Sequence, residues 1–99
     1  MEPADWLDRH TSQAPTMLRA RVREYALRAS GDSLPHILSS AGQSALTRVL
    51  SHAGDRSAAL DLLAADALIT LALLAQAETD PARLEEFATA VLRAARTHT

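Results

Sequence analysis

The most constraining feature of this 99-residue chain is the run from residue 57 to residue 77, SAALDLLAADALITLALLAQA. It has the length of one helix, and apolar side chains cover most of its circumference, although it also carries Asp61 and Asp66. A helix that is apolar on nearly every side must be enclosed, either within its own fold or against another subunit. The sequence therefore predicts a helical protein built around this segment.

The composition of the chain and the positions of its Pro and Gly residues both favour an all-α fold. Apolar residues make up 47% of the chain and are mostly Ala and Leu, which are strong helix formers. Pro near the start of a helix and Gly just past its end divide the chain at Pro15, Gly31, Gly54 and Pro81. We expect one domain, 1–99, with a leader helix over about 3–12 and helices over about 15–30, 33–53, 56–78 and 80–96. Connections this short make consecutive helices antiparallel neighbours, so we predict an antiparallel up-down four-helix bundle with a short N-terminal helix.

A helical wheel separates the 56–78 helix into three faces. A main stripe consists of Leu60, Leu63, Leu71 and Leu74, a second stripe of Leu62, Ile69 and Leu73, and a small-residue face of Ala58, Asp61, Ala65, Ala72 and Gln76. The small-residue face is expected to meet solvent. Because a monomeric bundle needs only one broad stripe per helix, the second stripe is expected to pair with another copy of the chain.

The two aspartates of this helix receive different interpretations. Asp61 lies in the first turns, where the helix dipole favours a carboxylate, and is expected to be solvated. Asp66 lies between the two large-residue stripes, one turn before Thr70, and is expected to be at least half buried. A buried charge without a partner is costly, so Asp66 should meet an Arg or Tyr25 of the 15–30 helix, another subunit or a ligand.

Two further features are candidate contact sites. Trp6 in the leader either covers one end of the core or anchors a partner, since Trp is enriched at binding hot spots. Arg19 and Arg23 are one helical turn apart and form a basic patch that either binds phosphates or carboxylates or is a solvated face balanced by acids. The predicted interface comprises Leu62, Asp66, Ile69, Thr70, Leu73 and Trp6.

Several classes of function are disfavoured. The chain has no Cys, and its four His lack metal-ligand spacing, so we assign no metal, cofactor or catalytic residue. A net charge of −2 makes nucleic-acid binding unlikely, and the small residues from Ser39 to Ala45 indicate close helix packing rather than a DNA-reading turn. The longest uncharged run of the apolar helix, 67–77, is shorter than the about 20 residues that span a bilayer. The use of Arg with no Lys fits the coding bias of a bacterium with a GC-rich genome. The acidic start of the chain, MEPADWLDRH, does not resemble a signal peptide, so we expect a cytoplasmic protein.

One short motif points to a family. The sequence Arg93-Ala-Ala-Arg-Thr-His98 resembles the R-x4-H motif of the HEPN family of helical-bundle ribonucleases. The resemblance implies that Arg93 and His98 would act in RNA cleavage.

The function predicted from the sequence is protein interaction. We expect a small non-enzymatic helical protein that pairs with itself as a homodimer, or with a larger protein, through the 56–78 helix. Two alternatives stay open: an HEPN-like ribonuclease that uses Arg93 and His98, and a small-ligand binder in which Asp66, Thr70 and Tyr25 line an interhelical pocket.

Overall fold

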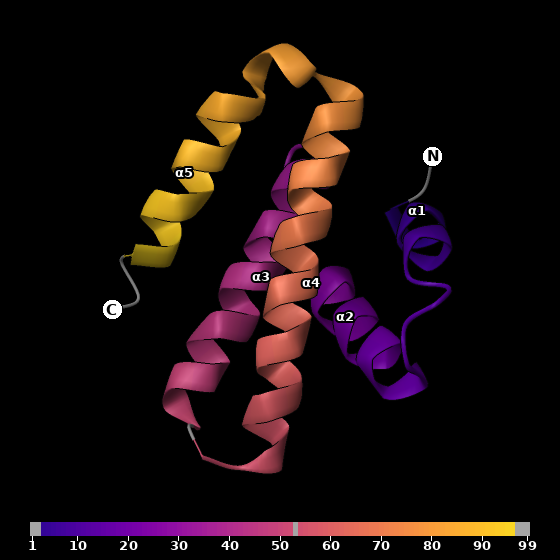
Figure 1. Ribbon diagram of the computed structural model, residues 1–99, viewed down its shortest axis with the longest axis vertical. Coiled ribbons are helices and arrows are strands. Elements are labelled where there is room, and N and C mark those ends of the chain that lie inside the picture. Colours follow the sequence, from indigo (N-terminus) through magenta and orange to yellow (C-terminus); the bar gives the residue numbers. More distant parts are fainter. Residues whose placement is uncertain (1–2, 53, 97–99) are drawn as a thin grey trace.

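The computed structural model describes residues 3–52 and 54–96, and within them every regular element is a helix (Figure 1). The all-α prediction is confirmed. The elements are α1 (Pro3–His10), α2 (Thr16–Arg28), α3 (Leu34–Ser51), α4 (Arg56–Thr79), the short 3-10 helix η1 (Pro81–Arg83) and α5 (Leu84–Arg96).

Local chemistry explains where the helices begin and end. The Asp55 side chain accepts a hydrogen bond of 2.7 Å from the backbone N–H of Ala58 and so caps the N-terminus of α4. Gly54 precedes it with φ of 101°, a left-handed conformation that favours glycine. α2 ends at Arg28 because the backbone of Ala29 is already extended. The turn after Asp80 is a 3-10 helix, so α5 begins at Leu84, later than the sequence predicts.

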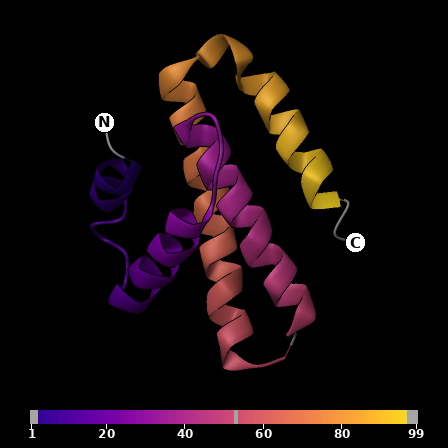
Figure 2. The same ribbon diagram turned by 180° about the vertical axis from the view of Figure 1, so that it is seen from behind.

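The centre of the molecule is an antiparallel hairpin of α3 and α4 (Figures 1 and 2). α2 runs obliquely across this hairpin, and α1 lies beside α2. α5 turns back after η1 and lies on the other side of the hairpin. There the side-chain amide of Gln43 on α3 donates a hydrogen bond to the carbonyl of Val91 on α5.

Small residues bring α3 and α4 into close contact. Ala41 and Ala45 on α3 and Ala64 and Ala72 on α4 are all fully buried. A Cβ placed on Gly42 would lie 2.8 Å from Cγ1 of Ile69, which is shorter than real side-chain contacts. The prediction that the small residues between Ser39 and Ala45 serve close helix packing is therefore confirmed for the middle of that stretch.

This contact determines how α4 is rotated, and here the sequence-based prediction was wrong. The small-residue face, expected to meet solvent, is the buried one, and its members Ala58, Asp61, Ala65, Ala72 and Gln76 are all buried. Asp61 is only 1% exposed, whereas Asp66, expected to be at least half buried, is exposed. The physical reason is that helices approach most closely through Ala, so the larger leucines are displaced outward and to the sides.

The leader helix α1 is part of the folded core. Trp6 and Leu7 are buried, and the hydroxyl of Thr11 donates a hydrogen bond to the carbonyl of Leu7. An ion pair between Asp8 and Arg23 joins α1 to α2 at 2.8 Å. α1 is thereby fixed against α2 by both apolar and ionic contacts.

The close α3–α4 contact predicts a cost for enlarging Gly42. We expect Gly42→Val to lower the free energy of unfolding by about 1–3 kcal/mol, because its side chain would displace Ile69. Ser44→Val, on the exposed side of the same helix, is the control and should change stability by less than about 0.5 kcal/mol. Urea unfolding measures both, and equal stabilities of the two variants would contradict the close contact.

Candidate interaction surface

The side of α4 turned away from the rest of the fold carries exposed leucines. Leu62, Leu63 and Leu74 are 52%, 56% and 40% exposed, and Asp66 and Thr70 are exposed among them. We call the set Ala59, Leu62, Leu63, Asp66, Thr70, Leu73, Leu74 and Ala77 the outward face. In Figure 1 α4 passes in front of α3, and none of the other described helices lies over it on this side.

The structure brings four of the six predicted interface residues to this side of α4. Leu62, Asp66 and Thr70 are exposed and Leu73 is partly buried at the edge of the core, whereas Ile69 packs toward Gly42 of α3. Single exposed leucines are ordinary on protein surfaces, but a run along successive turns of one helix forms a patch.

Trp6, the sixth predicted residue, belongs to the core instead. Its ring is 6% exposed and stacks on the ring of His10, with centroids 3.9 Å apart. The indole N–H donates a hydrogen bond of 3.1 Å to the carboxylate of Glu78, near the end of α4. Trp6 therefore covers one end of the core, which was the first of its two interpretations.

Sequence reasoning missed a buried polar cluster formed by Asp61, Arg21 and Tyr25. The guanidinium of Arg21 forms an ion pair with Oδ1 of Asp61, and the hydroxyl of Tyr25 donates a hydrogen bond of 3.0 Å to the same oxygen. The hydrogen bond to Asp61 raises the pKa of Arg21. Burial, followed by the hydrogen bond to Asp61, raises the pKa of Tyr25.

The prediction named the right kinds of partner, an Arg and Tyr25 of the preceding helix, but it named the wrong aspartate. We expected an Arg or Tyr25 of the preceding helix to meet Asp66, and they meet Asp61. The available signal was that Asp61 shares a face with Ala58, Ala65 and Ala72. Once such a face is placed inside, its carboxylate requires a partner.

The predicted basic patch is largely neutralised by neighbouring acids. Nη1 of Arg23 donates to both carboxylate oxygens of Asp8 at 2.8 Å. Arg28 pairs with Glu24 at 3.2 Å, and Arg21 is held by Asp61. Arg19, the other member of the predicted patch, is partly exposed. This arrangement favours a balanced surface over a phosphate-binding one.

A hollow of about 400 Å³ lies beside the outward face. Asp66 and Thr70 line it from α4, and residues 9–14 line it from the end of α1 and the following loop. Tyr25 is not among its lining residues. The hollow contains Asp66 and Thr70, as expected of the predicted pocket, but residues 9–14 line it in place of Tyr25.

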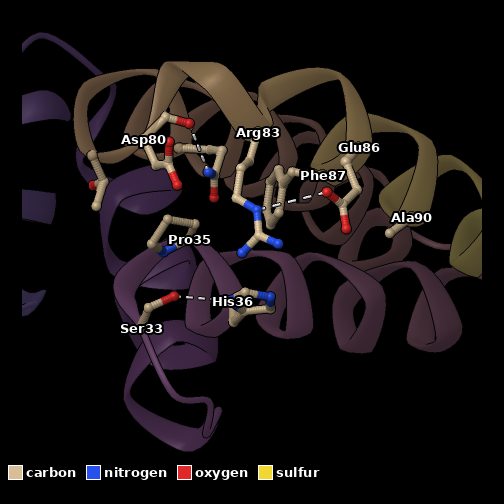
Figure 3. A pocket seen from close by; sticks show the side chains of 10 residues that line it. Ser33, Pro35, His36, Asp80, Arg83, Glu86, Phe87 and Ala90 are labelled. Atoms are coloured by element: carbon tan, nitrogen blue, oxygen red, sulfur yellow. Dashed lines mark hydrogen bonds and ion pairs between the residues drawn. The ribbon is translucent and has the colours of Figure 1, made fainter.

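A second hollow, of about 330 Å³, lies between the start of α3 and the η1–α5 turn (Figure 3). Within it Ser33 and Nδ1 of His36 are 2.8 Å apart, and the His36 ring meets the edge of Phe87. Arg83 and Glu86 form an ion pair of 3.7 Å on the opposite wall. A serine nucleophile needs a base that a third group orients, and none of the described carboxylates accepts a hydrogen bond from His36 to do so.

Other candidate chemistries find little support in the described part of the chain. Residues 3–52 and 54–96 contain no group of three or more His, Cys, Asp or Glu that could hold a metal ion. Arg93 is exposed on α5, and His98 lies outside the described residues, so the ribonuclease motif stays a prediction.

By length and composition α4 is also apolar enough to cross a membrane, with a mean hydropathy of 2.0 over its most apolar window. The core helix of a soluble protein meets the same criterion.

No family model matches the chain, and no curated protein or solved structure matches it significantly. The interpretation of the surface therefore depends on the chain's own geometry.

The buried ion pair predicts unequal effects for two arginines on α2. We expect Arg21→Met to lower the free energy of unfolding by about 3 kcal/mol, because it leaves the Asp61 carboxylate buried without its cation. Arg23→Met is the matched control. It removes only the half-exposed pair with Asp8 and should cost less than about 1 kcal/mol. Chemical denaturation measures the difference, which would vanish if Asp61 were solvated.

Tyr25 predicts a loss of stability in alkali. Its pKa is raised in the folded state, so the unfolded chain releases the phenolic proton first as pH rises. The stabilising contribution is complete below the ordinary Tyr pKa of about 10 and is lost as pH rises through the folded value. Tyr25→Phe should therefore flatten the decline in stability above about pH 10. Tyr25 is the only tyrosine, so phenolate absorbance follows it directly, and a titration at the ordinary pKa would contradict this account.

Proposed function

We propose that this chain is a small non-enzymatic interaction protein that forms a homodimer through the outward face of α4. The observation that carries the proposal is the exposure of Leu62, Leu63 and Leu74 on one side of the most apolar helix. Covering these side chains removes apolar surface from water, at about 25 cal/mol per Å². A helix of 24 residues is about 36 Å long, which is enough for an extended helix-to-helix seam.

The antiparallel up-down bundle expected from the short loops is part of this proposal. The α3–α4 hairpin has helices beside it and an open side at the outward face (Figure 1). A second hairpin docked there would give a four-helix arrangement of two α3 and two α4 helices. The four helices of the bundle would then come from two copies of the chain rather than from one.

A second copy suits this surface better than a lipid bilayer. Asp66 lies near the middle of α4, and a carboxylate at the bilayer centre costs about 2.5–3.5 kcal/mol on insertion scales. Crossing a membrane would also break the Asp61–Arg21 pair that joins α4 to α2. We therefore propose a cytoplasmic location, in a bacterium as the Arg-only composition suggests.

The proposal predicts that polar substitutions on the outward face abolish the dimer. Replacing Leu62, Leu63 and Leu74 with Ser should raise the dissociation constant more than about 100-fold, because these leucines lose their burial in the dimer. Native mass spectrometry and sedimentation velocity give the assembly state. Since all three side chains are already exposed, the monomer should keep its helical circular dichroism.

A matched control replaces three leucines of similar exposure elsewhere. Leu27, Leu50 and Leu92 are 65%, 54% and 53% exposed and lie on α2, α3 and α5. Their replacement with Ser should leave the dimer intact. A wild-type monomer would refute the proposal, and so would loss of the dimer only in this control. A monomer that sediments with phospholipid vesicles would assign the outward face to a membrane instead.

A further inference from the structure

The outward face of α4 has the same order of alanine, a leucine pair and a polar residue when read in either direction along the helix. From the N-terminal side it presents Ala59, the pair Leu62–Leu63, and Asp66. From the C-terminal side it presents Ala77, the pair Leu74–Leu73, and Thr70. Each member of the first series is as far from Leu68 as its counterpart in the second.

These eight positions occupy one continuous side of the helix. At about 100° per residue they fall within about 120° of the circumference, and Ala59 and Ala77 share the centre line. Asp66 and Thr70 lie within about 20° of that line, one on each side. The two leucine pairs flank the line at equal distances from the middle of the helix. Such a surface is self-complementary under a two-fold rotation.

This inference rests on the proposed self-association and specifies its geometry. We propose that two α4 helices pack antiparallel through their outward faces about a two-fold axis level with Leu68 along the helix, with Asp66 of each copy accepting a hydrogen bond from the Thr70 hydroxyl of the other. In that alignment the Leu62–Leu63 pair of one copy faces the Leu73–Leu74 pair of the second copy. The alanines at the ends let the backbones approach. Every contact occurs twice.

Electrostatics select this alignment over a parallel one. A parallel in-register pair places Asp66 against Asp66 of the second copy in a seam from which water is excluded, where like charges repel strongly. The antiparallel pair separates the two Asp66 residues by about 6 Å along the helix axis, which weakens their repulsion, and gives each carboxylate a hydroxyl donor. The aspartate is exposed in the single chain and needs a donor when the seam covers it, and the Thr70 hydroxyl of the second copy supplies one.

The ends of the helices are complementary in the same sense. Arg56 is exposed at the N-terminus of α4, while Glu78, whose carboxylate also accepts the hydrogen bond from Trp6, and Asp80 lie at its C-terminal end. Antiparallel packing brings Arg56 of one copy near the acidic end of the other. The helix dipoles also oppose one another favourably in this arrangement.

Engineered cysteines test the alignment, because the chain has no native Cys. Ala59→Cys and Ala77→Cys are made separately, and each is oxidised alone and as an equimolar mixture after subunit exchange. We expect disulfide-linked dimers in the mixture only. In either single variant the two thiols are about 27 Å apart across the two-fold axis, far beyond the reach of a disulfide.

The controls separate the alignment from self-association itself. A mixture of Ala59→Cys with Thr70→Cys, seven positions out of register, should not cross-link. If the wild type is a dimer but either single variant cross-links with itself, the antiparallel alignment is wrong and the proposed function stands. If the wild type is a monomer, both fail.

The Asp66–Thr70 contact has its own test. Thr70→Val keeps the shape and removes the hydroxyl donor, so it should weaken dimerisation at least about tenfold by leaving a buried carboxylate unpaired. Combining it with Asp66→Leu removes both polar partners and should restore the affinity, because neither group then remains unsatisfied. Equal affinities of the wild type and Thr70→Val would overturn the assigned hydrogen bond.

Discussion

The contact between α3 and α4 is the constraint on which the rest of the structure depends. Both helices present Ala at this contact, and Gly42 leaves room for Ile69 where any side chain would collide. Alanine gives little apolar area per residue, but it allows a long and close approach over many turns. Once the alanines of α4 and Leu68 face inward, the helix cannot also bury Leu62, Leu63 and Leu74 there. The outward position of Leu62, Leu63 and Leu74 is therefore a consequence of the packing of the core.

The same rotation turns Asp61 inward, and its buried carboxylate then needs a cation and hydrogen-bond donors, which α2 supplies. Arg21 supplies the cation and Tyr25 a neutral donor, both from one face of α2. A buried ion pair contributes little net stability compared with an apolar replacement, but breaking it is costly. It therefore fixes where α2 crosses the hairpin more than it strengthens the fold. α1 follows, since it is attached to α2 through the pair of Asp8 and Arg23.

The sequence predicts the helices well because proline, glycine and capping residues act locally. Asp55, Gly54 and Pro81 determine helix ends through their own backbone and side-chain geometry, with no reference to the rest of the fold. The rotation of α4 is a different kind of question. Hydrophobic periodicity assumes that the largest apolar residues point inward, whereas α4 buries its alanines. Its apolar residues surround the helix, so periodicity gives little information about which side faces inward. The choice between Asp61 and Asp66 failed for that reason alone.

An interior built on alanine also explains how one helix serves two surfaces. If α4 instead buried Leu62, Leu63 and Leu74 in the monomer core, its exposed side would carry mainly alanines. A dimer formed through that side would bury little apolar surface. With alanines and Leu68 inside, the monomer folds on close packing, and Leu62, Leu63 and Leu74 remain available for another surface. Folding and association then draw on different side chains of the same helix. Substitutions of the exposed side chains of the outward face, among them Asp66 and Thr70, therefore alter assembly without altering the fold.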